Sequence, residues 1–121
     1  MVRSALVVDD DSVSRLLLSH MLSEQGFGVC GATGVDDALD LCQQTDFALI
    51  VCDYLMPDKD GLDLLDALGE ESPPFILLTG HADRESLADD RVERVSSYLT
   101  KPVSTAELTA AVDEVLQSQS A

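Results

Sequence analysis

Residues 6–11 of this chain read LVVDDD, an apolar run that ends directly in three carboxylates. Residues 49–53 (LIVCD) repeat the arrangement, residues 75–80 (FILLTG) end in a hydroxyl and a glycine, and residues 98–102 (YLTKP) lead to a lysine. Short apolar runs bounded by turn residues are typical of buried strands in a parallel sheet. The carboxyl ends of such strands meet at the edge where open α/β sheets bind ligands. The pattern therefore predicts carboxylates, a hydroxyl and an ammonium group gathered at one edge of one sheet.

The groups expected at that edge indicate phosphoryl chemistry. Carboxylates that crowd together repel one another, so they require a cation. A cation held beside an aspartate, a threonine and a lysine suits the handling of a phosphoryl group. The candidate site residues are Asp9, Asp10, Asp53, Thr79 and Lys101.

Strands and helices alternate along the chain without internal repeats. We expect strands at residues 4–9, 28–32, 47–53, 75–79 and 97–101. We expect helices at residues 12–24, 35–44, 61–69, 83–90 and 105–117. Five βα units in this rhythm predict an α/β fold in which helices cover both faces of a five-stranded parallel sheet.

Local signals support several helix starts. Ser104 and Glu107 form a capping-box pattern, and Asp11 is placed to cap the first helix. Residues 58–61 (DKDG) could be read as part of a calcium loop, but the required ligands are missing at both ends of such a loop. We interpret them as the acidic turn that opens the third helix.

The first predicted helix is apolar on two sides. One side, which we expect to pack on the sheet, carries Val13, Leu16, Leu17, His20 and Met21. Leu18 and Leu22 point roughly the other way. Either neighbouring helices cover these two leucines, or they form an exposed strip for a partner protein. We take Leu18 and Leu22 as candidate partner-docking residues, and we expect His20 to be a packed or boundary residue.

Size and charge limit the possible functions. The 121 residues fit one domain, residues 1–121. The net charge of −16 argues against direct binding to nucleic acid. No apolar run approaches the roughly 20 residues of a membrane span and no signal peptide is visible, so we expect a cytoplasmic protein. Three cysteines without metal or disulfide spacing are expected to act as small buried apolar residues: Cys30, Cys42 and Cys52.

Over essentially its whole length the chain resembles the response-regulator receiver domains of bacterial two-component signalling, in particular single-domain regulators of the chemotaxis type. The motifs that carry the resemblance stand in register at successive strand ends: residues 8–11, 53–61, 79–80 and 101–102. It implies a flavodoxin-like, doubly wound five-stranded parallel sheet with five helices. It also implies a phosphoryl acceptor that works with Mg²⁺ and receives its group from a sensor histidine kinase or a phosphotransfer protein.

The resemblance implies the roles of the acidic residues. Asp53 is the phospho-acceptor, a carboxylate nucleophile that attacks the phosphorus of a phosphohistidine. Asp10 and Asp53 are direct Mg²⁺ ligands, Asp9 acts mainly through water, and the backbone carbonyl of Leu55 completes the set. Mg²⁺ keeps several waters, so these few ligands are enough.

The resemblance also implies how the phosphoryl group is recognised. Lys101 pairs with Asp53 and later with a phosphoryl oxygen, and a cis bond to Pro102 is expected to aim it inward. Thr79 hydrogen-bonds the phosphoryl group, and Gly80 leaves room for a backbone N–H. Tyr98 matches the switch aromatic of the family, although it could equally be a half-exposed strand tyrosine. The switch is expected to change a surface that binds an unknown downstream protein.

Two departures and two alternatives remain. Leu55 and His81 flank the path of an attacking water in the family, and an apolar Leu55 cannot orient that water, so we expect slow to moderate self-dephosphorylation. Residues 92–97 lack the glycine usual before the fifth strand. The Asp-x-Asp within residues 9–11 would also suit a phosphatase of the haloacid-dehalogenase type. A receiver-shaped protein that binds partners without accepting phosphate is the second alternative. We expect a signalling domain and not an enzyme with turnover, either stand-alone or part of a longer chain.

Overall fold

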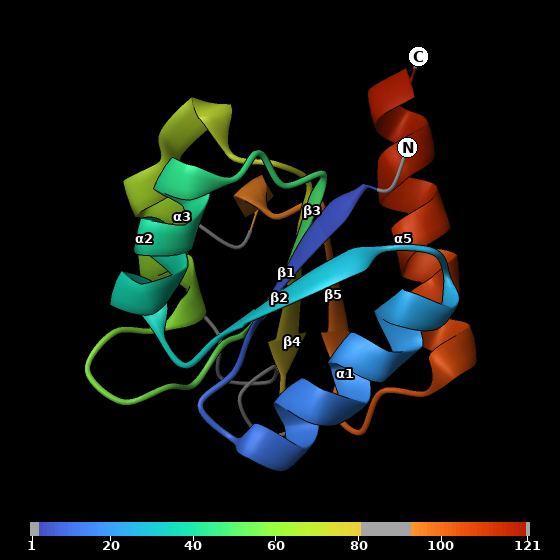
Figure 1. Cartoon of the computed structure of the whole chain (residues 1–121), viewed down its shortest axis with the longest axis horizontal. Helices are drawn as coiled ribbons and strands as arrows, with labels where there is room; N and C mark the ends of the chain where they lie inside the picture. The colour runs from blue at the N-terminus through green and yellow to red at the C-terminus, as the bar shows by residue number, and fades with distance from the viewer. Residues whose placement is uncertain (1–2, 81–92, 121) are drawn as a thin grey trace.

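The computed structural model describes residues 3–80 and 93–120, which form a parallel sheet between two layers of helices (Figure 1). The strands are β1 (Ser4–Val8), β2 (Gly28–Ala32), β3 (Leu49–Asp53), β4 (Phe75–Thr79) and β5 (Ser97–Thr100). The helices are α1 (Ser12–Glu24), α2 (Val35–Gln44), α3 (Gly61–Leu68), the 3₁₀ turn η1 (Gly69–Glu71) and α5 (Thr105–Ser120). All strands are parallel, in the order β2-β1-β3-β4-β5.

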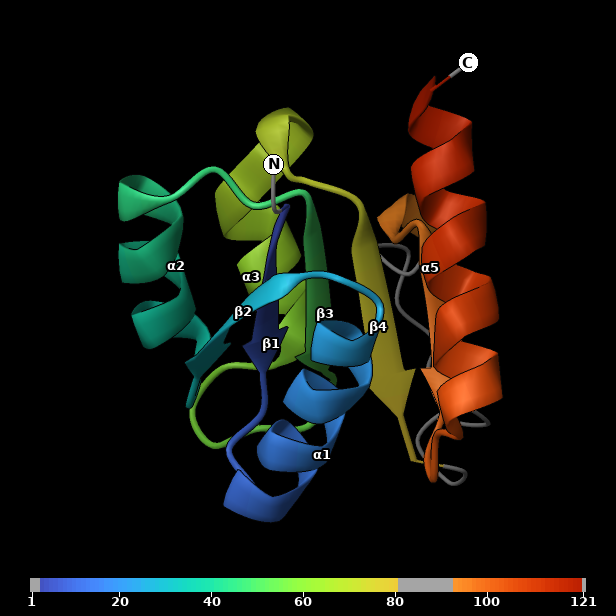
Figure 2. The same ribbon diagram turned by 45° about the vertical axis from the view of Figure 1, so that its right-hand side comes forward.

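Among the described helices, α1 and α5 cover one face of the sheet and α2 and α3 cover the other (Figures 1 and 2). Alternate residues of β1 point to opposite faces, as the pleat of a strand requires. Ala5 and Val7 belong to the core beneath α1 and α5, and Leu6 and Val8 belong to the core beneath α2 and α3. Burial on both faces explains why the strands read as continuous apolar runs.

The predicted fold is confirmed within the described residues. All five strands are present, and every predicted element that is described agrees with the structure to within three residues at each end. The helix expected at residues 83–90 and His81 lie outside the described residues. Residues 3–80 and 93–120 therefore contain four of the five expected helices.

The predicted orientation of α1 was wrong. Leu18 and Leu22 are buried, with 6% and 0% of their surface exposed, in the core that α1 shares with α5. The exposed apolar residues are Val13 (63%), Leu16 (71%) and Leu17 (55%). Both sides of the helix are apolar, so periodicity could not decide which side meets the sheet. Neighbouring elements therefore cover Leu22 completely, whereas Leu18 is mostly covered but still lines a groove beside Lys101 and Pro102.

His20 also differs from its predicted setting. It is exposed, and its Nε2 lies 3.0 Å from a carboxylate oxygen of Glu24, one turn further along α1. It is exposed with Leu16 and Leu17, whereas Met21, which the periodicity places on the same side, packs partly against the core.

The predicted helix starts are present. The Asp11 carboxylate accepts a hydrogen bond from the Ser14 backbone N–H (3.2 Å) and caps α1. Ser104 and Glu107 form a reciprocal capping box, with N–O distances of 3.1 and 3.2 Å. At α3 the N-cap is Asp60, whose side chain accepts from the backbone N–H of Asp63 at 3.0 Å. These caps satisfy amide groups that the first helical turn leaves unpaired.

Candidate functional site

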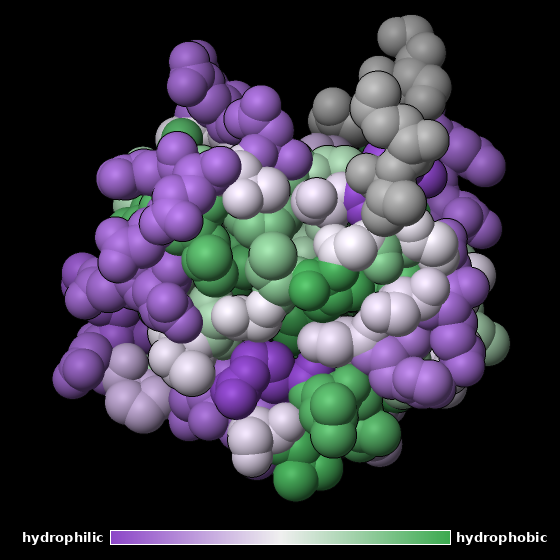
Figure 3. Space-filling view, in the orientation of Figure 1, coloured by the Kyte–Doolittle hydropathy of each residue, from purple (hydrophilic) through white to green (hydrophobic). Residues whose placement is uncertain are grey.

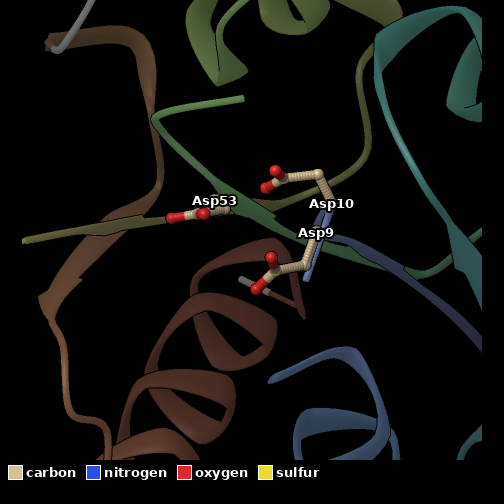
Figure 4. Close-up of side chains that lie close together, drawn as sticks. All are labelled: Asp9, Asp10 and Asp53. Carbon is tan, nitrogen blue, oxygen red and sulfur yellow. The ribbon is translucent and has the colours of Figure 1, made fainter. Parts of the chain in front are cut away.

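Three carboxylates lie together where β1 and β3 end. These two strands are paired, and the strand order reverses between them, which is where open α/β sheets form their binding crevice. Asp9 and Asp10 follow β1, and Asp53 is the last residue of β3. Figure 4 shows the three side chains reaching toward the same region beyond the strand ends. One carboxylate oxygen from each lies within 4.8 Å of the others.

Asp9 is the buried member of the group, with 0% of its surface exposed. Its Oδ1 accepts a hydrogen bond from the Asp11 backbone N–H at 2.9 Å, and its Oδ2 lies 3.1 Å from Lys101 Nζ. A buried carboxylate is costly unless it is paired in this way. Asp9 is therefore held on both oxygens, whereas Asp10 is exposed.

Lys101 lies between two of the acids. Its Nζ is 3.1 Å from Asp9 Oδ2 and 3.3 Å from Asp53 Oδ2. Burial disfavours the charged form of Lys101, but the negative charges of Asp53 and Asp9 outweigh it and raise its pKa. The expected cis bond between Lys101 and Pro102 is present. Within residues 3–80 and 93–120, Lys101 is the only cation in ion pairs with this group of three carboxylates.

The carboxyl group of Asp53 has a raised pKa. Burial raises the pKa of its carboxyl from 3.8 to about 6; Lys101 opposes the rise, and Asp9 and Asp10 add to it. Its side chain is 13% exposed, so part of it remains accessible to solvent. An added cation stabilises the charged form of a carboxyl group whose pKa is raised in this way, because the cation offsets both the lost hydration and the repulsion from neighbouring acids.

Thr79 ends β4 with an unused hydroxyl. The residue is 1% exposed, and within residues 3–80 and 93–120 its Oγ1 has no hydrogen-bond partner. Its carbonyl accepts a hydrogen bond from the Lys101 backbone N–H at 2.8 Å, so the two residues are joined through the backbone. An unpaired buried hydroxyl is uncommon, and it leaves a donor for an incoming oxygen.

Two further predicted residues lie at the surface. Tyr98 on β5 is 41% exposed, and Leu55, two residues after Asp53, is 54% exposed. The half-exposed setting of Tyr98 is compatible with both interpretations of this residue. Cys52, by contrast, is completely buried in the core on the α2–α3 side, and burial raises the pKa of its thiol well above the usual range.

Sequence reasoning missed two residues that shape the site. A Cβ at Gly61 would lie 2.6 Å from the backbone oxygen of Asp53, so only glycine lets the start of α3 approach the end of β3 this closely. Arg15 on α1 donates from Nη1 to the Asp9 carbonyl oxygen at 2.9 Å. A glycine next to a capping aspartate hints at a close approach, but no local signal marks Arg15.

The residues present fit a small divalent cation. Mg²⁺ prefers carboxylate oxygens and keeps part of its water shell, which suits a partly open group of three acids. The excess negative charge and the raised pKa of Asp53 are features that such a cation would relieve.

Residues 5–113 match the family model described as the response regulator receiver domain. The chain belongs to this family. It is therefore a receiver domain of two-component signalling, a class of domain that serves as phospho-acceptor and that interacts with histidine kinases or phosphotransfer proteins and with downstream effectors. Of the helices in the described ranges, none has the length and apolar character needed to span a membrane.

Individual relatives cover almost the whole chain. An uncharacterized 14.6 kDa protein of Leptolyngbya boryana is 37% identical over 113 residues, covering 90% of this chain and 86% of the relative. Chemotaxis protein CheY-3 of Vibrio cholerae is 29% identical over 119 residues, covering 93% and 90%. The response regulator TrrA of Thermotoga maritima, solved in complex with Mg(2+)-BeF, superposes with a TM-score of 0.85 at 27% identity, covering 95% of this chain and 100% of that one. The chain spans 55% of the length of other relatives, which are transcriptional regulatory proteins.

Proposed function

We propose that Asp53 accepts a phosphoryl group from a phosphohistidine of a sensor histidine kinase or phosphotransfer protein, with Mg²⁺ as cofactor, and that this switches a protein-binding surface. The observation that carries the proposal is the meeting of residues from four strand ends: Asp9 and Asp10, Asp53, Thr79, and Lys101. Side chains from four separate parts of the sequence supply a nucleophile, a cation site, an ammonium group and a free hydroxyl.

The acidic residues perform two tasks in this proposal. Asp10 and Asp53, with Asp9 and the backbone carbonyl of Leu55, would hold Mg²⁺, which when bound neutralises charge between the acceptor and the phosphoryl group. An Asp53 oxygen forms the new bond to phosphorus while the bond from phosphorus to the donor imidazole nitrogen breaks. The Asp9 carboxylate is already bonded to Lys101 and to the Asp11 N–H, so its position beside the nucleophile is fixed.

Recognition of the phosphoryl group falls to Lys101 and Thr79. The Lys101 ammonium group is 3.3 Å from Asp53, close enough to donate a hydrogen bond to one of the new phosphoryl oxygens. The Thr79 hydroxyl, which has no partner among residues 3–80 and 93–120, gains a hydrogen bond when it turns toward that group. We propose that Tyr98 then moves inward and that the surface of β5 and α5 shifts population toward a form that binds the downstream protein.

The donor is proposed to dock on the exposed side of α1. Figure 3 shows an apolar area over the start of this helix, where Val13, Leu16 and Leu17 are exposed. A groove lined by Leu17, Met21, Lys101, Pro102 and Val103 continues from it. Lys101 also contacts Asp53, so a donor helix seated here would bring its phosphohistidine beside the acceptor. The cytoplasmic location expected from the sequence stays a prediction.

Labelling with acetyl phosphate tests the function directly. Wild-type protein incubated with acetyl phosphate and MgCl₂ should gain the mass of one phosphoryl group, and Asp53→Asn should gain none. Steady turnover of phosphate esters without a phosphoprotein would favour the phosphatase alternative. A wild type that neither gains mass nor turns over esters would favour a protein that only binds partners.

A further inference from the structure

Arg15 is bonded to the peptide that joins two of the three acids. Its Nη1 donates to the carbonyl oxygen of Asp9 at 2.9 Å, and that carbonyl belongs to the peptide bond between Asp9 and Asp10. Among the residues that the structure describes, Arg15 forms no ion pair with a carboxylate. A guanidinium beside three acids that bonds to a neutral carbonyl acts on backbone geometry more than on charge.

The neighbouring strand supports the arginine. A Cβ at Gly31 would lie 3.1 Å from Arg15 Cδ and 3.4 Å from Cγ, so the stem of Arg15 lies against the bare backbone of β2. Gly31 pairs with Val7 on β1, two residues before Asp9. The stem therefore crosses the edge strand, and the guanidinium reaches the end of β1.

The two acids differ in what else holds them. The carboxylate of Asp9 is fixed by the Asp11 N–H and by Lys101, and its backbone N–H donates to Ala32 O at 3.1 Å. Asp10 is exposed, and no hydrogen bond to its carboxylate is found within residues 3–80 and 93–120. The hydrogen bond of Arg15 to the Asp9 carbonyl therefore restrains the peptide from which Asp10 extends, whereas no hydrogen bond among the described residues is found to restrain its carboxylate.

We propose that Arg15 is a positioning residue that orients the Asp9–Asp10 peptide and thereby aims the Asp10 carboxylate at the cation site. The inference rests on the proposed function, because it concerns the same site. This proposal predicts a change in Mg²⁺ affinity opposite to the change expected from charge alone. A positive side chain near a cation site repels the cation, so charge alone predicts that removing Arg15 tightens Mg²⁺ binding. Orientation predicts that removing it weakens binding.

Isothermal titration with MgCl₂ at constant ionic strength separates these effects. Arg15→Met removes the charge and the hydrogen bond but keeps an apolar stem, and we expect Mg²⁺ affinity to fall about tenfold, as for other groups that orient metal ligands. Arg15→Lys keeps the charge but loses the planar guanidinium, and it should weaken binding as well. Lys59→Met is the matched control, since it removes one positive charge from an exposed pair with Asp36 and should not weaken binding.

A double-mutant cycle shows whether the effect passes through Asp10. Arg15→Met should cost little further affinity in the Asp10→Asn background, because the group that it orients is no longer a carboxylate. Gly31→Val provides a second approach, since it displaces the stem and leaves the charge in place, and it should also weaken binding. Urea unfolding without Mg²⁺ identifies any variant that fails to fold, in which case Gly31→Val decides.

The outcomes distinguish this inference from the proposed function. If Arg15→Met binds Mg²⁺ as tightly as wild type or more tightly, or weakens it equally with Asp10→Asn present, the positioning role is wrong and the phospho-acceptor function stands. If wild-type protein binds no Mg²⁺, the inference and the metal site fall together, and acetyl phosphate labelling of Asp53 then judges the acceptor role by itself.

Discussion

At the scale of single residues, the site is organised by unequal burial of similar groups. Asp9 is completely buried and fully paired, Asp53 is mostly buried and only partly paired, and Asp10 is exposed. Three aspartates therefore have three different environments, and Asp9 and Asp53 both lie close to Lys101. For Asp53, burial is the main cause of the raised pKa of its carboxyl, and the charges of Asp9 and Asp10 add to it.

Asp53→Asn should stabilise the protein without Mg²⁺ at neutral pH. The pKa of Asp53 is about 6 in the folded protein against 3.8 ordinarily, so the folded state holds this proton more tightly than the unfolded chain. Its contribution to stability is therefore lost as pH rises from about 4 to about 6, and it stays lost above that range. Asparagine avoids a penalty of about 3 kcal/mol at most at pH 7.5.

Urea unfolding of both proteins in a chelator, from pH 4 to pH 8, measures this. The stability gain of Asp53→Asn should be close to zero near pH 4 and should grow to a plateau above pH 6. A variant less stable than wild type at pH 7.5 would mean that the ion pair with Lys101 outweighs the burial of Asp53.

Leu55→Asn should shorten the lifetime of the acyl phosphate. Leu55 is 54% exposed two residues after Asp53, and its apolar side chain cannot orient an attacking water. An amide at this position can do so, and we expect dephosphorylation to accelerate severalfold, since positioning a water is a modest catalytic contribution. Decay of the phosphoprotein followed by mass measures it, with Leu55→Met as the apolar control. An unchanged lifetime in Leu55→Asn would contradict the assignment.

At the scale of elements, the site depends on how two helices approach the strand ends. The start of α3 sits against the end of β3, where Gly61 N–H donates to Tyr54 O at 2.9 Å. Helix α1 leaves β1 through a short turn, and its exposed apolar side lies beside the groove that Lys101 lines. The packing of these two helices on the core therefore determines how the site can be reached.

Gly61→Ala should destabilise the fold and disturb Asp53. The added methyl group would lie 2.6 Å from Asp53 O and 2.9 Å from Leu77 Cδ1, and the backbone oxygen cannot move aside easily. We expect a loss of about 1–3 kcal/mol, typical of overpacking, together with slower phosphorylation. Urea unfolding and acetyl phosphate labelling measure the two effects. Gly34→Ala is the matched control, because a Cβ there meets nothing within 4 Å. Equal stability of Gly61→Ala and wild type would refute the close approach.

Leu16→Glu should slow phosphotransfer from the donor protein. Leu16 is 71% exposed, so a charge there disturbs a docking surface and not the core. We expect transfer from the cognate kinase or phosphotransfer protein to fall about tenfold or more, while labelling by acetyl phosphate stays at the wild-type rate. Transfer kinetics with a phosphorylated donor measure the effect. The same rate in wild type and Leu16→Glu would remove α1 from the donor interface.

At the scale of the whole molecule, the excess of acidic residues shapes the response to ions. The net charge is −16 for 121 residues, and self-repulsion of this size destabilises the folded state. Dissolved salt screens that repulsion in general, whereas a divalent cation at the three aspartates acts at one place. The two effects therefore require separate measurement.

MgCl₂ should raise the unfolding temperature more than NaCl does at equal ionic strength. A ligand that binds only the folded state stabilises it by about 2.7 kcal/mol at 100 times its dissociation constant. The excess over NaCl should largely disappear in Asp10→Asn, which retains most of the net charge. Thermal unfolding followed by circular dichroism measures it. An equal response of wild type and Asp10→Asn would indicate screening without a specific site.

The sequence alone determined the sheet, the helix caps and the residues expected at the site. Continuous apolar runs that alternate with helical segments, as at residues 49–53, are typical of a parallel sheet covered by helices, and parallel strands bring their carboxyl ends together. Caps such as Asp11 and Ser104 depend on residues within a single turn, so local sequence is sufficient for them.

Only the tertiary structure decided which surfaces are buried and how the acids are held. Helix α1 is apolar on two sides, and the position of the sheet and α5 determines that Leu18 is inside and Leu16 outside. The burial of Asp9, the crowding at Gly61 and the reach of Arg15 arise between segments far apart in the chain. Such contacts depend on where neighbouring backbones come to lie, and no periodicity or local motif encodes that.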